Sequence, residues 1–223
     1  MDYNFDKIVD RRGTNSLKWA VPENELPMWV ADMDFQVAPE VKAAILKRAE
    51  HGVFGYSIIP KEWYDAYIKW WDRRHHFRME KDWLLFVTGV IPAISSAVRR
   101  LTAVGENVLV QTPVYNQFFT SIVNNGRNVA EAPLRYDEQN YYIDFKELEQ
   151  KLADPDTTLM LLCNPHNPVG KIWDKETLAK IGELCFKHHV KVLSDEIHCD
   201  LTAPKREYVP FASASELCRK ISV

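Results

Sequence analysis

Acidic residues and a histidine gather at the end of one apolar segment. Residues 190–200 read VKVLSDEIHCD, and the motif carries Asp195, Glu196, His198 and Asp200. A carboxylate at the end of a buried strand costs free energy unless a partner compensates its charge. The partner could be a metal ion, the magnesium of a bound nucleotide, or a protonated ring nitrogen of a cofactor.

The sequence speaks against the first two partners. Asp195, His198 and Asp200 could each bind a metal, but ligands this close together at a strand–loop junction diverge in direction, and no second His/Asp cluster completes a site. We therefore predict no metal site. A magnesium nucleotide needs a GxxxxGK[ST] loop. Here Gly170-Lys171 is followed by Ile172 and lacks the upstream glycine.

Three further motifs follow apolar segments. TGVIPA (88–93) is a glycine turn that opens a helix, so the amides of Gly89, Val90 and Ile91 could hold a phosphate. Tyr115 follows the next apolar segment and could stack on a planar ligand. Either feature alone could equally be an ordinary turn or ordinary packing. NPHNPVG (164–170) is more specific, because two Asn-Pro pairs restrict the backbone and can aim an asparagine amide.

Helical and apolar segments alternate along the chain and must position these motifs. The expected helices span 39–50, 60–76, 92–102, 115–125, 144–153 and 174–189. The expected strands span 128–134, 157–165 and 190–196, and 83–89 and 107–113 are each expected to be a strand followed by a turn. Residues 219–223 look like the start of another strand. Strands that are apolar throughout predict a three-layer α/β/α fold with a mostly parallel sheet. Such sheets bind ligands at the carboxyl ends of their strands.

A phosphate cradle, a stacking tyrosine, an asparagine and an aspartate together describe a site for pyridoxal 5′-phosphate (PLP). With these motifs the sequence resembles the fold-type I PLP enzymes of the class I/II aminotransferase superfamily. PMWVADMDF (27–35), FGYS (54–57), TGVIPA, NPHNPVG and SDEIHCD look like the MalY/PatB group of cysteine-S-conjugate β-lyases. The resemblance covers almost the whole chain.

The resemblance implies roles for the cofactor ring and its phosphate. Asp195 pairs with the protonated pyridine N1, and Asn167 donates to the phenolic O3′. His198 stands where relatives have a tyrosine that also contacts O3′. Tyr115 stacks on the ring, and the phosphate lies on the amides named above.

The resemblance also implies contacts outside this core. Tyr56 reaches the phosphate of a neighbouring subunit in a homodimer, and the backbone at Ala31 lies near the carboxylate of a small amino-acid substrate. Residues 1–50, an N-terminal arm with the first helix, belong with the small domain of the family. Residues 51–223 form the PLP-binding large domain, which we expect to be incomplete.

The expected activity is cleavage of the C–S bond of cystathionine-like substrates to a thiol, pyruvate and ammonia. The family's Schiff-base lysine follows the DEI[HY] motif in a Ser-Lys or Ser-x-x-Lys turn, and neither Lys205 nor Lys220 has that context. We therefore assign no catalytic residue in this chain. We expect a fragment, roughly the first half to three-fifths of a family member, that is inactive alone. An aminotransferase, a truncated pseudo-enzyme or regulatory module, and a metal hydrolase are the alternatives.

The composition limits the possible partners and location. The net charge of −3 gives no reason to expect nucleic acid, and no apolar run is long enough to span a membrane. The N-terminus lacks the apolar core of a signal peptide, and four cysteines without a CxxC pair indicate free thiols. We expect a cytoplasmic protein. The run Arg73-Arg74-His75-His76 is interpreted as a solvated helix face.

Overall fold

The computed structural model describes residues 3–223 of the chain. These residues form two compact units with a boundary between Ile58 and Ile59. The first unit is irregular up to α1 (Pro39–His51), which ends at Gly52 in a left-handed conformation with φ of 68°. No residue of α1 is buried.

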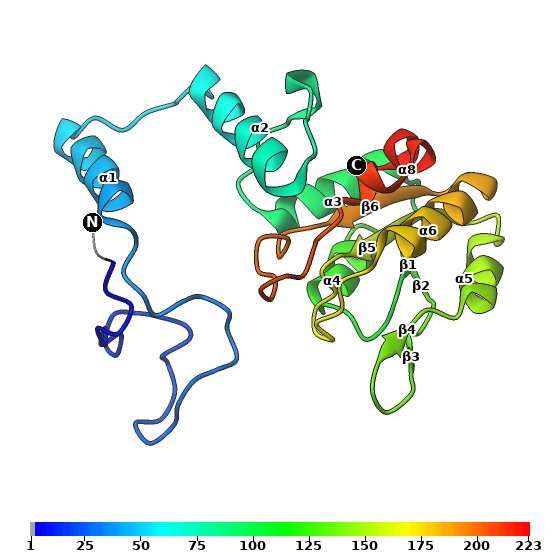
Figure 1. Cartoon of the computed structure of the whole chain (residues 1–223), viewed down its shortest axis with the longest axis horizontal. Coiled ribbons are helices and arrows are strands. Elements are labelled where there is room, and N and C mark those ends of the chain that lie inside the picture. The colour runs from blue at the N-terminus through cyan, green and yellow to red at the C-terminus, as the bar shows by residue number, and fades with distance from the viewer. Residues whose placement is uncertain (1–2) are drawn as a thin grey trace. The chain divides into compact units, whose positions relative to one another are not determined.

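The second unit is built on a parallel sheet of four strands (Figure 1). The strands are β1 (Asn107–Val110), β2 (Asn128–Glu131), β5 (Thr157–Cys163) and β6 (Lys191–Asp195), in the order β2-β1-β5-β6. Every neighbouring pair in this sheet is parallel. The strands predicted within residues 107–113, 128–134, 157–165 and 190–196 are thus confirmed.

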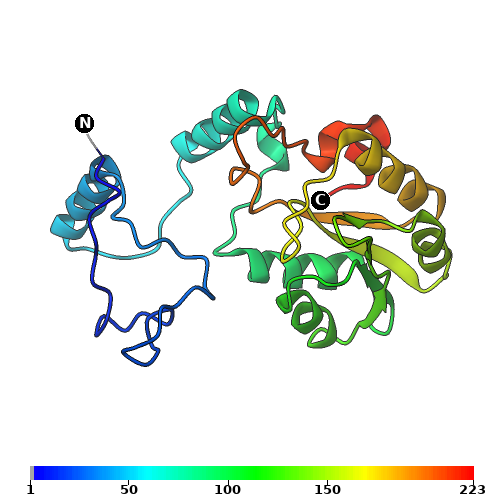
Figure 2. The same cartoon turned by 60° about the horizontal axis from the view of Figure 1, so that its bottom comes forward.

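Helices cover both faces of the sheet (Figure 2). One face carries α3 (Val90–Leu101) and α4 (Gln117–Val123), and the other carries α5 (Phe145–Leu152), α6 (Lys175–Lys187), α7 (Phe211–Ala214) and α8 (Glu216–Ile221).

Alternation along the strands divides the core between these two faces. Val108 and Leu159 enter the cluster with α3 and α4, whereas Leu109 and Met160 enter the cluster with α5 to α8. The predicted three-layer α/β/α class is therefore confirmed.

The strand predicted within residues 83–89 is wrong. A 3₁₀ turn occupies Lys81–Trp83, and the residues up to Thr88 are irregular. An apolar run becomes a strand only if another strand accepts its backbone hydrogen bonds. Among residues 3–223, no strand pairs with this segment, and Leu85 is 84% exposed. A short antiparallel pair that the sequence did not signal, β3 (Arg135–Tyr136) and β4 (Tyr141–Tyr142), lies elsewhere in the unit.

The strand prediction for residues 219–223 is also mostly wrong. Ser215 caps α8 by accepting a hydrogen bond from the Cys218 amide at 3.1 Å. Cys218 and Ile221 are buried on the same side of that helix. Only the last residues pair with the sheet, where Ser222 forms a parallel bridge with Val192.

The basic run at the end of α2 (Lys61–His75) is only partly solvated. Arg73 and Arg74 are exposed, but His75 is buried. The four cysteines are free and buried, as predicted. Within the part of the chain that the structure describes, no helix combines the length and apolar character needed to cross a membrane.

Candidate functional site

Asp195 is the last residue of β6 and lies beside Cys163, the last residue of β5. Its Oδ1 accepts a hydrogen bond from the Ile197 amide at 3.2 Å. Burial raises the pKa of Asp195 above its usual value, while the Ile197 amide and His198 oppose that shift only in part. The ionised form of such a carboxylate is stabilised when a cation or a cationic N–H lies close to it.

The NPHNPVG turn starts at the neighbouring strand end and is anchored by Asn164, which is fully buried. The backbone N–H of Asn164 donates to the backbone carbonyl of Asp195 at 3.0 Å. Its side-chain Oδ1 accepts from the Trp173 amide at 3.2 Å, and its Nδ2 donates to the Val209 carbonyl at 3.3 Å. Asn164 therefore joins the two strand ends to the loops that follow them.

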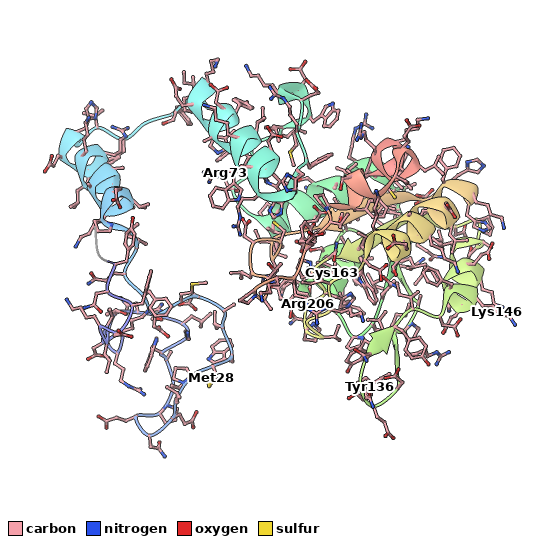
Figure 3. All side chains as sticks on the ribbon, viewed as in Figure 1. Met28, Arg73, Tyr136, Lys146, Cys163 and Arg206 are labelled. Atoms are coloured by element: carbon pink, nitrogen blue, oxygen red, sulfur yellow. The ribbon has the colours of Figure 1, made fainter. Side chains whose placement is uncertain are left out.

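Cys163, which is labelled in Figure 3, contacts the second asparagine of the turn. Burial raises the pKa of Cys163 to about 12, so its side chain is a thiol at neutral pH. Its Sγ donates a hydrogen bond to the Pro165 carbonyl and accepts one from the backbone N–H of Asn167, both at 3.4 Å. The Asn167 side chain is half-buried at the surface of the turn.

His166 links this turn to the loop that carries Tyr115. The His166 Nε2 donates to the Pro113 carbonyl at 2.9 Å, and burial lowers the pKa of His166 so that the ring stays neutral. The Tyr115 ring is 37% exposed and packs edge-on against Phe118. These contacts give His166 a structural role in the turn.

The amino end of α3 follows Gly89, as the TGVIPA motif predicted. Its first amides have no partners within the helix, and this end of the helix carries a partial positive charge. Val90 and Ile91 pack against the core cluster that contains Cys163 and Leu193. Gly89 is extended, and a Cβ there would make only an ordinary contact with Pro92 at 3.5 Å. The turn therefore forms without backbone strain at Gly89.

Asn167 and His198 line the same open cleft, whose volume is about 980 Å³. Lys171, Lys205 and Arg206 also line it. The structure thus brings together two groups that are 31 positions apart in the sequence, because β5 and β6 are neighbours in the sheet. Both side chains can hydrogen-bond to an oxygen of a bound molecule.

Glu196 and Asp200 do not line this cleft and instead bind other elements of the second unit. Glu196 Oε1 accepts from the Ser194 hydroxyl at 2.9 Å and from the amide of Phe211, the first residue of α7, at 2.8 Å. Asp200 accepts hydrogen bonds from residues of α2. Asp195, His198 and Asp200 do not gather as a ligand set within residues 3–223.

Ala31 and Tyr56 belong to the first unit. Ala31 is exposed in an irregular segment, and the next residues of that segment are held by ion pairs. Arg11 binds Asp32 at 2.5 Å and Asp34 at 2.7 Å, and Lys18 binds Asp34 at 2.8 Å. The side chain of Tyr56 is fully exposed. Their proposed contacts with a substrate and a partner subunit remain predictions.

The sequence carried little signal for Cys163 and none for the separate task of Asn164. Both lie in or beside a motif that was assigned to ligand binding through Asn167. Their role becomes visible only in the structure, where Asp195 and Cys163 lie side by side at the ends of neighbouring strands.

A model of the aminotransferase class I and II family matches residues 25–218. The chain belongs to the aminotransferase class I and II family. Within the family it is similar to cystathionine β-lyase PatB of Bacillus subtilis, with 44% identity over 99% of this chain and 58% of PatB. It is also similar to protein MalY of Escherichia coli, with 34% identity over 96% of this chain and 56% of MalY.

Solved structures of family members have the same fold. Cystalysin from Treponema denticola, a structure that contains a pyridoxal 5′-phosphate cofactor, matches with a TM-score of 0.94 and 36% identity. That match covers 100% of this chain and 58% of cystalysin. The chain therefore spans less than two-thirds of the length of these relatives.

Proposed function

We propose that this chain forms the PLP-binding part of a carbon–sulfur lyase that acts on cysteine S-conjugates. The observation that carries the proposal is the half-buried Asp195 carboxylate, which lacks a strong cationic neighbour at the strand end where Asn167 and His198 also lie. The residues present fit PLP, which has a basic ring nitrogen, a phenolic oxygen and a phosphate. The similarity to PatB favours lyase activity over other PLP chemistry.

Each candidate residue has a physical task in this proposal. Asp195 keeps a proton on the ring nitrogen, and Asn167 and His198 hold the phenolic oxygen. The free amides of Gly89, Val90 and Ile91 bind the phosphate at the amino end of α3, and Tyr115 covers the ring. When bound, PLP supplies an electron sink for the electron pair that is left when a proton leaves the substrate Cα.

Further contacts would come from the first unit and from a second subunit. We propose that the backbone near Ala31 contacts the substrate carboxylate, and that Arg11 and Lys18 keep this segment in place through Asp32 and Asp34. We also propose a homodimer in which the exposed Tyr56 reaches the phosphate of the neighbouring site. Residues 1–50 would then contribute to the small domain.

Binding can be tested with the chain itself. Pyridoxamine 5′-phosphate keeps the ring, the phenol and the phosphate of PLP but needs no lysine for attachment. Calorimetry should detect one molecule bound per chain, and Asn167→Ala should weaken that binding about tenfold by removing a hydrogen bond to the phenolate. An absence of saturable binding would contradict the proposal.

Activity can be tested when a relative supplies the Schiff-base lysine that the family uses. A chimera that joins this chain to the remaining part of PatB should release pyruvate from L-cystathionine without an added keto acid. The class I and II family also contains aminotransferases, so that activity is the second candidate. A strict requirement for a keto-acid acceptor would favour the aminotransferase and exclude the lyase.

A further inference from the structure

Asp200 accepts two hydrogen bonds and forms one ion pair with residues in the last two turns of α2, the helix that carries the labelled Arg73 in Figure 3. Trp70 Nε1 donates to Oδ2 at 2.8 Å, and His75 Nε2 donates to Oδ1 at 3.0 Å. The Arg74 guanidinium lies 3.5 Å from Oδ1. The carboxylate therefore uses both oxygens to bind a helix that is 125 residues away in the sequence.

Apolar side chains strengthen the same attachment. Cys199 and Tyr208 form a buried cluster with Trp71 and Phe77, which is separate from the two clusters on the sheet. The His75 ring packs edge-on against the Tyr208 ring, with 5.3 Å between the ring centroids. The turn after β6 is thus fixed by the buried Cys199 and by the hydrogen bonds of the more exposed Asp200.

We propose that Asp200 is a positioning residue that holds His198 at the cleft by clamping the turn to α2. This inference rests on the proposed function, in which His198 contacts the phenolic oxygen. The turn is short: the Cys199 amide donates to the Glu196 carbonyl at 3.0 Å, and the Leu201 amide donates to the His198 carbonyl at 2.9 Å. One end is fixed by Asp195 in β6 and the other by Asp200, so His198 between them has little freedom.

A metal site is the competing interpretation of the same residues. One ligand atom each from His75, Cys199 and Asp200 lies within 4.8 Å of the others. However, Oδ1 of Asp200 already faces the cationic Arg74, and burial raises the pKa of Cys199 to about 12, so the thiolate that a metal needs is disfavoured. The hydrogen-bonded clamp accounts for all of these contacts.

Hydrogen exchange of the chain tests the clamp without any ligand. Asp200→Asn preserves the size of the side chain. It cannot accept hydrogen bonds at both terminal atoms, because one of them is the nitrogen of an N–H₂ donor. The amides of Cys199 and Leu201 should exchange about tenfold faster, whereas those of β1 and β5 should not change. Trp70→Phe removes one donor and should have a smaller effect in the same turn. Asp72→Asn, at an exposed position of α2, is the matched control.

A double-mutant cycle tests the positioning role. Asp200→Asn should weaken pyridoxamine 5′-phosphate binding about threefold to tenfold, and should have no further effect in a His198→Ala background. An equal loss in both backgrounds would overturn the role, as would unchanged exchange of the turn. Stoichiometric zinc binding that Cys199→Ser abolishes would overturn it in favour of the metal site. If the unmodified chain binds no pyridoxamine 5′-phosphate, the proposed function and the positioning role both fail, and hydrogen exchange alone decides the clamp.

Discussion

The substitution Asp195→Asn tests the central electrostatic feature of the site. Asparagine has almost the same shape and can still accept the hydrogen bond from the Ile197 amide. It removes the negative charge and replaces one carboxylate oxygen by an N–H₂ donor. Because burial raises the pKa of Asp195 in the folded chain, the carboxylate pays a desolvation cost that a cationic ring N–H would offset.

The expected size of the effect follows from the interaction that is lost. A hydrogen bond to a charged group contributes about 1.5–3 kcal/mol, and each 1.36 kcal/mol corresponds to a factor of ten. Removing the charge should therefore raise the Kd for pyridoxamine 5′-phosphate about 10- to 150-fold. The exposed control Asp72→Asn should leave the Kd unchanged.

Calorimetry with two ligands separates this interaction from a general loss of affinity. The 1-deaza analogue of pyridoxamine 5′-phosphate keeps the phosphate and the phenol but has a C–H in place of N1. The unmodified chain should prefer the natural ligand, and Asp195→Asn should bind both about equally. Binding needs ionised Asp195 and the folded pKa is raised, so the preference should grow as pH rises above the usual range of an aspartate. A variant that still prefers the natural ligand would refute the reasoning.

Three further predictions concern stability. Gly182→Ala places a Cβ 2.3 Å from the Sγ of Cys218, so urea denaturation should show a loss of about 1–3 kcal/mol, which the double variant with Cys218→Ala should largely recover. Asn164→Ala removes both side-chain hydrogen bonds of a fully buried residue and leaves the Trp173 amide unpaired, at a cost of about 1–3 kcal/mol by the same assay; wild-type stability would contradict its anchoring role. Burial raises the pKa of Glu196, so the folded state binds more protons than the unfolded state between the two pKa values, and stability falls as pH rises through that interval. Glu196→Gln keeps an acceptor for its donors and should flatten this decline in thermal unfolding measured across pH, whereas an unchanged slope would show that another group causes it.

Local sequence patterns determined most elements of the second unit. Asp174 was expected to begin a helix, and its side chain accepts from the Thr177 amide at 2.7 Å. The apolar runs of β1, β5 and β6 could be identified because both faces of each strand are covered by helices. Such a pattern can be identified within a single segment, because the spacing of its apolar residues indicates which positions are buried.

Pairing between distant segments could not be determined in this way. The run 83–89 has the composition of a strand but finds no strand partner within the described residues, and residues 216–221 form a helix because Ser215 caps them. His75 belongs to a basic run, yet it is buried because Asp200 and Tyr208 lie against it. Backbone hydrogen bonds and buried ion pairs depend on which segments meet, and no local pattern records that.

The sequence by itself determined the residue types of the site and the sheet edge at which they lie. Asp195 ends one recognisable strand, Asn167 and His198 follow recognisable strands, and parallel strands place their carboxyl ends together. Only the tertiary structure decided how these groups are held. The Asn164 bonds across the strand ends and the Asp200 clamp on α2 join segments that are distant in the sequence, and the Cys163 thiol contacts Asn167 within the turn. Burial makes the bonds of Asn164 and Cys163 costly to lose.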